Sequence, residues 1–495
     1  MYKQVLAVII LFITAILAGC SSGGTNCNQC YGTGNPIPTP PTPEPERHLL
    51  NRCYGLRGDD RGYSIIETSD GCLAMAGISS TMQRGDADVW ILKIDPTIAD
   101  IEESVVFSQT YGGSLEDWCY SMIETHDKHL AVTGYTYSTD GDLTGVTHQG
   151  EADLWVLKIN PDPNIPKNDT IAFNQCYGGS GVDRGSSIIE THDRYLAIAG
   201  YTDSNNNGDV QGNHGQNDAW ILKINPDKTI PRIDTIEFKN CYGGNRGDWA
   251  YDIIETNDRY LAITGETFSN NGNLQSNNGE CDLWVFKINP DKTIPNRDAT
   301  VIFSHNYGSS AIDFGYRIIE TKDGCLAIAG RADSNNGDLV NAEHHGGPDL
   351  WVLKIDPAVA ADPAATDRGI VFNYCYGGAD DDNSRDIIET EDGCLALTGY
   401  TFSTDGDLTG KGNHGDADLW ILKIDPTIAN RTQGIVFNRC YGGSGYDRGE
   451  KLVETNDKCL AVTGYTNSND GDVSGNHGDN DLWVLKIDKN GNYTN

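Results

Sequence analysis

The sequence predicts an all-β fold, a seven-bladed β-propeller whose blades are four-stranded sheets. Three observations predict it: a unit of 63 to 69 residues that occurs seven times, four short apolar runs in each unit, and an unpaired copy of the fourth run near the N-terminus. Because a periodic chain can build one large closed domain, we expect residues 47–495 to form a single propeller.

A tryptophan in the pattern D-x-W marks each unit. The seven are Trp90, Trp155, Trp220, Trp284, Trp351, Trp420 and Trp483. In the sixth unit the apolar runs are "RDIIET", "CLALTGYT", "DLWILKID" and "GIVFNRCYGG". These runs are rich in β-branched and aromatic residues and are separated by Gly, Asn and Asp, so they predict four strands, in chain order A to D.

The runs are apolar at consecutive positions, as in "LWVLKI", which indicates strands buried on both faces. Sheets arranged radially around an axis bury both faces, which is the propeller architecture. An extended stack of sheets is the alternative, but it needs atypical capping repeats that this chain does not show.

Strands A, B and C each occur seven times, but the last unit ends at Asp488 with only "KNGNYTN" after it, and so lacks strand D. Before the first unit lies "RHLLNRCYG", a strand D without the other three. Closing a ring removes exposed sheet edges. We therefore expect residues 49–53 to pair with residues 483–487 and to complete the seventh blade.

These units resemble those of the bacterial tandem-repeat β-propeller lipoproteins, whose blades read roughly "YGG…D…I.ET.DG…GyT.S.DGD…D.WvlKid". The likeness covers residues 47–495 and recurs seven times. It implies the propeller fold but no particular function, because propellers host enzymes, binding proteins and scaffolds alike.

The N-terminus predicts export and lipid anchoring. Residues 1–19 have the layout of a signal peptide, one lysine followed by an apolar run too short to span a bilayer comfortably. The letters "LAGC" resemble a bacterial lipobox, which implies cleavage before Cys20 and acylation of its thiol, for example with palmitate. An ordinary signal peptide or a short anchor is the alternative. Residues 20–46 end in the proline-rich "NPIPTPPTPEPE" and predict a flexible tether.

From this we expect an exported monomer at the outer membrane or cell surface, attached to the membrane only through its lipid. Its 71 acidic residues against 36 basic ones give a net charge of −35. Such a chain repels phosphate backbones, which excludes nucleic acid as a partner.

Three charged positions recur in every blade. Strand A begins with Asp60, Asp117, Asp183, Asp248, Asp313, Asp382 and Asp447, and ends with Glu67, Glu124, Glu190, Glu255, Glu320, Glu389 and Glu454. Strand C carries Lys93, Lys158, Lys223, Lys287, Lys354, Lys423 and Lys486. Buried charges must be paired or hydrogen-bonded, so we expect each Asp to accept backbone N–H groups in its turn and each Glu to meet a Lys.

The long loops between strands B and C, such as "STDGDLTGKGNHGDAD", are candidates for calcium binding. Closely spaced oxygens on glycine-containing turns suit Ca²⁺. The candidate ligands are Asp140, Asp142, Asp405, Asp407, Asp470 and Asp472. The alternative is that these residues simply make turns. The same loops hold His148, His214, His344, His345, His414 and His477, which we expect to hydrogen-bond nearby aspartates rather than to bind a transition metal.

Fourteen cysteines would suit a disulfide framework in an exported protein. Most of them, however, lie before the strand D tyrosine or at the start of strand B, which are opposite ends of a blade and too far apart to bridge. We therefore expect packed thiols, and no redox or metal role for the lone "CNQC" at Cys27 and Cys30.

The least repetitive patch suggests where a ligand binds. It comprises Asp380, Asp381 and Asp382 between blades five and six, with Trp118 and Trp249 at equivalent rims of blades two and four. Acids and aromatics on one rim suit a sugar or a cationic peptide, although a solvated turn also explains the acids. The sequence thus predicts a binding or scaffold module for protein or glycan ligands. The alternative is a carbohydrate-active enzyme, hydrolase or lyase, with a carboxylate pair in the central pocket.

Overall fold

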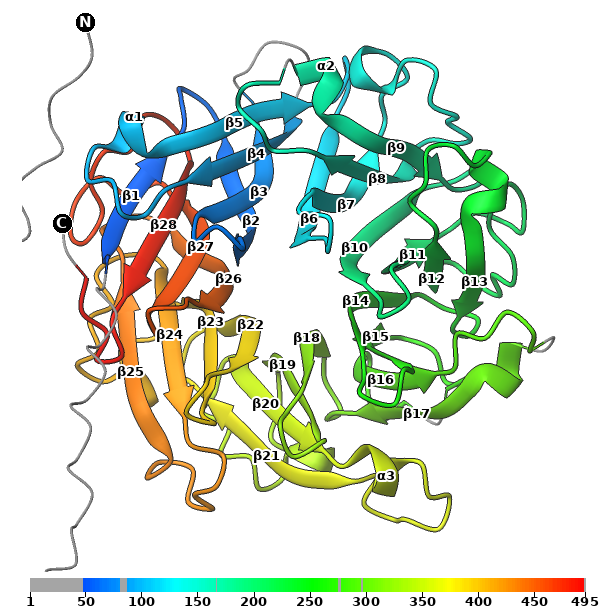
Figure 1. Cartoon of the computed structure of the whole chain (residues 1–495). Coiled ribbons are helices and arrows are strands. Elements are labelled where there is room, and N and C mark those ends of the chain that lie inside the picture. The colour runs from blue at the N-terminus through cyan, green and yellow to red at the C-terminus, as the bar shows by residue number, and fades with distance from the viewer. Residues whose placement is uncertain (1–47, 81–86, 166, 275–276, 295–296, 494–495) are drawn as a thin grey trace, which may run out of the picture. The chain divides into compact units, whose positions relative to one another are not determined.

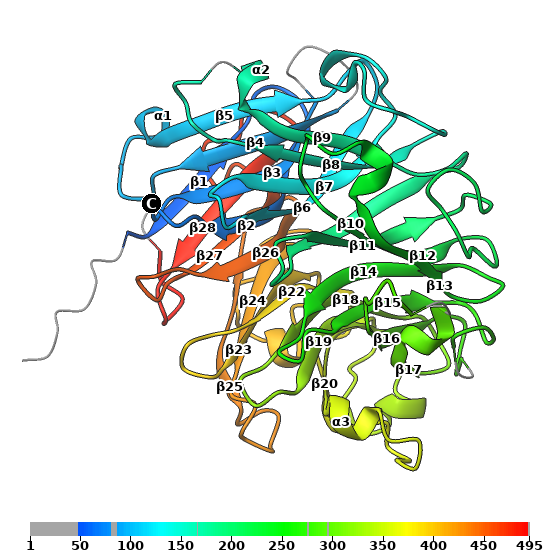
Figure 2. The ribbon, with the colours of Figure 1, turned by 45° about the vertical axis from the view of Figure 1, so that its right-hand side comes forward.

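The computed structural model describes residues 48–495, apart from residues 81–86, 166, 275–276, 295–296 and 494–495. The described residues contain seven four-stranded antiparallel sheets arranged as a ring around a central axis (Figure 1). Figure 2 shows the same sheets after a turn of 45° about the vertical axis, with neighbouring sheets face against face. The predicted all-β, seven-bladed propeller is therefore confirmed.

In the first six blades the strands follow chain order from the axis outward. Blade one contains β2 (Asp60–Glu67), β3 (Leu73–Ser79), β4 (Asp88–Ile94) and β5 (Val105–Tyr111). Blade two contains β6 (Asp117–Glu124), β7 (Leu130–Thr136), β8 (Asp153–Ile159) and β9 (Ile171–Tyr177). Blade three contains β10 (Asp183–Glu190), β11 (Leu196–Thr202), β12 (Asp218–Ile224) and β13 (Ile236–Tyr242). Blade four contains β14 (Asp248–Glu255), β15 (Leu261–Thr267), β16 (Asp282–Ile288) and β17 (Val301–Tyr307).

The remaining blades repeat this plan. Blade five contains β18 (Asp313–Glu320), β19 (Leu326–Ala332), β20 (Asp349–Ile355) and β21 (Ile370–Tyr376). Blade six contains β22 (Asp382–Glu389), β23 (Leu395–Thr401), β24 (Asp418–Ile424) and β25 (Ile435–Tyr441). Blade seven contains β26 (Asp447–Glu454), β27 (Leu460–Thr466), β28 (Asp481–Ile487) and, from the other end of the propeller, β1 (Leu50–Tyr54).

The described helices are single turns in the connecting loops, and none is long and apolar enough to cross a membrane. They are α1 (Ile101–Ser104), α2 (Lys167–Thr170), α3 (Pro357–Ala360), η1 (Gly141–Leu143), η2 (Arg232–Thr235), η3 (Arg297–Thr300), η4 (Gly337–Leu339) and η5 (Gly406–Leu408).

Ring closure follows the predicted pairing. Strand β1 is antiparallel to β28, and Cys53 lies opposite Trp483. The indole Nε1 of Trp483 donates a hydrogen bond of 2.7 Å to Asn51 Oδ1. The early strand therefore completes blade seven and leaves no blade with a missing outer strand.

The core lies between adjacent blades rather than inside any one of them. Every residue of the second and third strands of blade six, β23 and β24, is buried, because neighbouring sheets cover both faces. One position in the second strand admits only glycine: a Cβ on Gly399 would lie 1.8 Å from the backbone oxygen of Asn383 in β22. The "TGY" of the repeat thus permits close approach of the two inner strands.

The recurrent aspartates are buried and accept backbone N–H groups in their own turns, as predicted. Asp117, for example, accepts from Gly113 N at 2.7 Å. The equivalent donors to the other six are Leu56, Gly179, Gly244, Ser309, Gly378 and Gly443.

The predicted pairing of recurrent glutamates with recurrent lysines is wrong. Each lysine instead reaches an aspartate in the turn between strands A and B of its own blade, at 2.6–2.8 Å. Burial opposes ionisation of Asp70, but the hydrogen bond from Lys93 lowers the pKa of Asp70 to about 2. The glutamate carboxylate is engaged elsewhere, because a backbone N–H of the neighbouring blade donates to it, as Ser69 does to Glu124 at 3.0 Å.

Each recurrent glutamate accepts a backbone N–H from the A–B turn of the preceding blade. The donors are Ser69, His126, His192, Asn257, Lys322, Glu391 and Asn456, at 2.7–3.0 Å. The last of these bonds joins Asn456 of blade seven to Glu67 of blade one. A continuous ring of inter-blade hydrogen bonds therefore crosses the closure.

The eleven cysteines among the described residues are free thiols, and ten of them are buried, as the sequence predicts. The predictions for Cys20, Cys27 and Cys30, the signal peptide and the tether lie outside the described residues.

Deletion of residues 48–54 removes the outer strand of blade seven. We expect the variant to aggregate or to unfold at a markedly lower temperature than the full chain, because it exposes the edge of β28. Size-exclusion chromatography and thermal unfolding measure this. A deletion variant that stays monomeric with unchanged thermal stability would contradict the closure.

A matched pair of point variants controls for general disruption. Asn51 and Asn438 make the same two contacts in blades seven and six, one to a tryptophan Nε1 and one to a loop carbonyl. Either change to alanine loses about 1 kcal/mol per hydrogen bond. Asn51→Ala should lower the free energy of unfolding more than Asn438→Ala does. The reason is that β1 is the one outer strand that the chain does not connect directly to the other strands of its blade.

Candidate functional site

Each inner strand contains a β-bulge at its fourth residue. In β10, for example, Gly185 pairs with Gly200 and Ser187 with Ala199, so Ser186 has no partner in the register. The seven bulged residues are Tyr63, Tyr120, Ser186, Tyr251, Tyr316, Arg385 and Glu450. A bulge bends its strand and re-aims a side chain.

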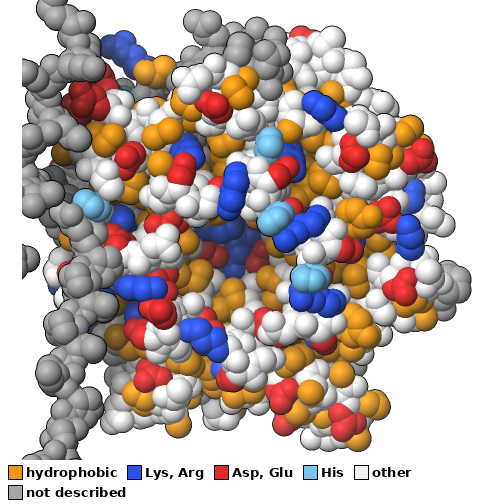
Figure 3. All heavy atoms as spheres, viewed as in Figure 1, with side chains coloured by type: hydrophobic (Ala, Val, Ile, Leu, Met, Phe, Trp, Pro, Cys, Tyr) orange, Lys and Arg blue, Asp and Glu red, His pale blue; other side chains and the backbone are white. Residues whose placement is uncertain are grey.

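All seven bulged residues line one pocket at the centre of the ring. Its volume is about 470 Å³, within the range of small-molecule sites. Figure 3 shows the face of the propeller that contains a central hollow, with Lys and Arg side chains at its base. One bulge from every blade therefore builds a single shared cavity.

One part of the pocket wall is aromatic. The rings of Tyr63 and Trp118 stack with centroids 5.8 Å apart, and Tyr120 lies 6.0 Å from Trp118. Trp118 Nε1 is buried and has no hydrogen-bond acceptor among the described residues. Burial raises the pKa of Tyr120 to about 12, so its phenol is neutral at physiological pH.

Another part of the wall is basic. Arg448 Nε lies 2.5 Å from Glu450 Oε1, and Arg385 Nε lies 3.8 Å from Glu450 Oε2. Two guanidinium groups therefore share one carboxylate. Both also stack on tyrosine rings, with Arg385 4.6 Å from the Tyr316 centroid, which holds the guanidinium planes in place.

The other two arginines of the pocket also lie near carboxylates. Arg61 is bound by both carboxylate oxygens of Asp59, at 2.8 Å each. Arg317 lies 3.6 Å from Asp252 and 3.5 Å from Asp386. Burial lowers the pKa of the neighbouring Lys451; Arg317 adds to this effect, and Asp386 and Asp252 only partly offset it.

The two predicted ligand-binding tryptophans occupy the same position in their blades but different surroundings. Trp118 lines the central pocket. Trp249 packs edge-on against Tyr201 and Phe268, with centroids 6.2 and 5.7 Å away, and does not line the pocket.

The three consecutive acids do not form one patch. Asp380 is exposed, and Asp381 lies 3.4 Å from Arg331. Asp382 is fully buried and is one of the recurrent turn aspartates. Burial raises the pKa of Asp382 to about 7, although hydrogen bonds from Thr401, Gly378 and Ser403 favour its ionised form.

All six carboxylates proposed for calcium accept hydrogen bonds from backbone N–H groups. Asp142, Asp407 and Asp472 also contact Lys167, Arg431 and Tyr493, respectively. Asp140, Asp405 and Asp470 each cap the turn between blades. Within the described ranges, no group of three or more His, Cys, Asp or Glu side chains is arranged to hold a metal ion. The calcium site stays a prediction.

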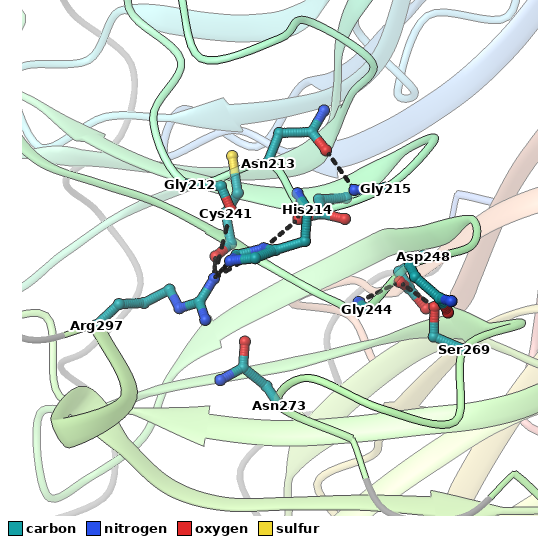
Figure 4. Close-up of polar contacts among 12 residues, drawn as sticks. Gly212, Asn213, His214, Gly215, Cys241, Gly244, Asp248, Ser269, Asn273 and Arg297 are labelled. Carbon is teal, nitrogen blue, oxygen red and sulfur yellow. Dashed lines mark hydrogen bonds and ion pairs between the residues drawn. The ribbon is translucent and has the colours of Figure 1, made fainter.

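The loop histidines lie as expected in four blades. His214, His345, His414 and His477 contact the aspartate four residues later at 2.7–3.1 Å. Figure 4 shows the blade-three loop, where Arg297 Nη1 donates to Cys241 O at 3.1 Å and lies 2.9 Å from His214 Nε2. These contacts fix the loop against the next blade.

Sequence reasoning missed most of the pocket. Apart from Trp118, none of its residues was predicted, although every bulged residue stands three positions after a recurrent aspartate. That position varies between blades, from Tyr to Ser, Arg and Glu, and so do the residue after it and the residue two before it, whereas the first Asp and the last Glu of the strand repeat. This departure from the repeat is the signal that could have identified the pocket.

No protein-family model matches the chain, and no curated protein matches its sequence. Solved structures with a similar fold include hydrazine synthase of Kuenenia stuttgartiensis, at 11% identity and a TM-score of 0.42, over 81% of this chain and 92% of that one. A Mycobacterium tuberculosis puromycin-hydrolyzing peptidase is 10% identical with a TM-score of 0.42, over 89% of this chain and 52% of the other.

A Fusarium graminearum α-L-arabinofuranosidase, solved with arabinobiose, is 9% identical with a TM-score of 0.35, over 74% of this chain and 92% of that one. Likenesses this distant carry no argument about function, since one fold hosts many activities.

Glu266 in β15 is a buried acid next to the pocket wall, and its protonation changes near neutral pH. It accepts hydrogen bonds from the bulged Tyr251 and from Cys281. Burial raises the pKa of Glu266 to about 7, and these bonds only partly offset the effect. Since the folded pKa lies above the unfolded one, the native state binds this proton more tightly, and stability falls as pH rises from about 4.5 to 7.

Glu266→Gln removes this titration. Relative to the wild type, the variant should gain on the order of 3 kcal/mol in unfolding free energy between pH 4.5 and 8, the equivalent of the pKa shift. Denaturant unfolding at each pH measures it. Exposed Glu280→Gln serves as the control and should show no such trend; parallel pH profiles for wild type and Glu266→Gln would contradict the prediction.

Proposed function

We propose that this protein is a lipid-anchored binding module of the cell surface, and that its ligand, a glycan or part of a protein, occupies the central pocket. One observation carries the proposal. In the inner strands, whose first Asp and last Glu repeat in all seven blades, the positions that vary supply most of the residues that line this one cavity. Packing does not require the variation, because the bulged residues lie outside the strand register.

A carbohydrate-active enzyme is less well supported. Hydrolysis of a glycosidic bond usually needs two carboxyl groups, one on each side of the scissile bond. Of the residues that line the described pocket, Glu450 alone carries a carboxylate, and it is paired with Arg448. Binding chemistry therefore fits the wall better than acid–base chemistry.

Trp118→Ala tests the position of the ligand site. It removes an aromatic face from the pocket wall, and we expect it to weaken ligand binding about tenfold or more. Binding of the full chain to arrayed glycans and to surface proteins in pull-downs measures this. Trp249→Ala is the matched control, the same residue at the same place in a blade but outside the pocket. Equal effects of both changes would place the site elsewhere.

Cys20→Ser tests the anchor. We expect this variant to incorporate no palmitate and to leave the membrane fraction, because the thiol is the proposed site of acylation. Metabolic labelling and fractionation of cells measure both. Cys27→Ser should behave as the wild type. Labelling that persists in Cys20→Ser would overturn the lipoprotein assignment.

A further inference from the structure

The lining of the pocket carries four arginines and a single carboxylate, that of Glu450. Arg61 is paired with Asp59, and Arg317 lies near Asp252 and Asp386. Arg385 and Arg448 share the single carboxylate of Glu450. A buried cation needs an anionic partner, so this wall is built to receive one more negative charge.

Arg385 is the group of the wall best placed to receive it. Its Nε is buried, lies beyond hydrogen-bond distance of Glu450 at 3.8 Å, and has no acceptor among the described residues. The guanidinium also stacks on Tyr316, which fixes its plane. A fixed guanidinium plane favours a bidentate contact with a planar or tetrahedral oxyanion.

The rest of the wall favours a sugar over other small anions. Six tyrosines and Ser186 line the pocket together with Trp118, and the lining contains no aliphatic side chain. Hydroxyl groups that both donate and accept match the hydroxyls of a sugar ring, and the stacked faces of Tyr63 and Trp118 suit its C–H face. An acyl chain would find no aliphatic surface here.

We infer that the central pocket binds a monoanionic saccharide unit, with its negative charge at Arg385 and Arg448 and its ring against Tyr63 and Trp118. This inference rests on the proposed function and specifies the ligand. The anion can be the carboxylate of a uronate or a sulfate ester, which carry the same single charge.

The test measures binding of the full chain by isothermal titration to galacturonate, glucuronate and mannuronate monosaccharides, to monosulfated galactose, and to neutral galactose. We expect the charged probes to bind and the neutral one to bind at least about tenfold more weakly. Preference between the uronates and the sulfated sugar identifies the anion.

Three variants test the placement of the charge. Arg385→Gln should weaken binding of the charged probe about tenfold to a hundredfold, and Arg385→Lys should restore part of the loss. Glu450→Gln should instead strengthen binding, because it removes the carboxylate that competes with the ligand. A loss of structure cannot produce this gain. Arg246→Gln, on the exposed rim of blade four, should leave affinity unchanged.

The outcomes separate this inference from the proposed function. Neutral sugars or peptides could bind as strongly as the charged probes, with Trp118→Ala abolishing this binding. That result would overturn the anionic saccharide as the ligand and keep the pocket as the ligand site. Charged probes that bind equally well to Trp118→Ala and Arg385→Gln would overturn both. Failure of every charged probe to bind the wild type would also overturn the inference.

Discussion

The backbone pairing of β1 with β28 is the interaction on which the rest of the structure depends. Each blade buries its middle strands only because a neighbouring blade covers each of its two faces. The ring of seven blades closes without an exposed strand edge at the seam only when blade seven has its outer strand. Leu50 and Tyr54 of β1 pack with Leu73 and Trp90 of blade one in a single apolar cluster. The seam is therefore packed like the other interfaces, and the inner strands are held around one axis.

The repeated polar residues make variation at the axis possible. Turn aspartates, lysine–aspartate pairs and inter-blade glutamates satisfy their charges within one blade or between two neighbours, so none of them depends on the pocket. The bulged residue of each inner strand has no partner in the register and belongs to none of these sets. A substitution there changes the cavity while the hydrogen bonds that hold the blades stay the same. A highly repetitive chain can thus carry one asymmetric site.

The strands, their order and the closure could be predicted because they follow from local pattern and from counting. The partners of the recurrent glutamates could not be predicted, because charge complementarity does not say which of several nearby groups is closest. The partner of Glu124 is a backbone N–H from the neighbouring blade. The pocket was missed for a related reason. A bulge shifts the strand register by one residue without any change in the apolar pattern, so that pattern did not distinguish Arg385 from the other residues of its strand. The three consecutive acids Asp380 to Asp382 were conspicuous in the sequence, but in the structure each has different surroundings.

A basic pocket and a net charge of −35 are compatible because the two act at different distances. At physiological ionic strength, charges more than about 8 Å apart across solvent are largely screened, so most exterior acids contribute little inside the cavity. Arg385 and Arg448 act on a ligand at contact and in partly buried surroundings, where an ion pair is worth more. The exterior still repels any long polyanion that would lie across the face of the propeller. This combination favours one small anionic unit in the pocket and disfavours a densely charged chain.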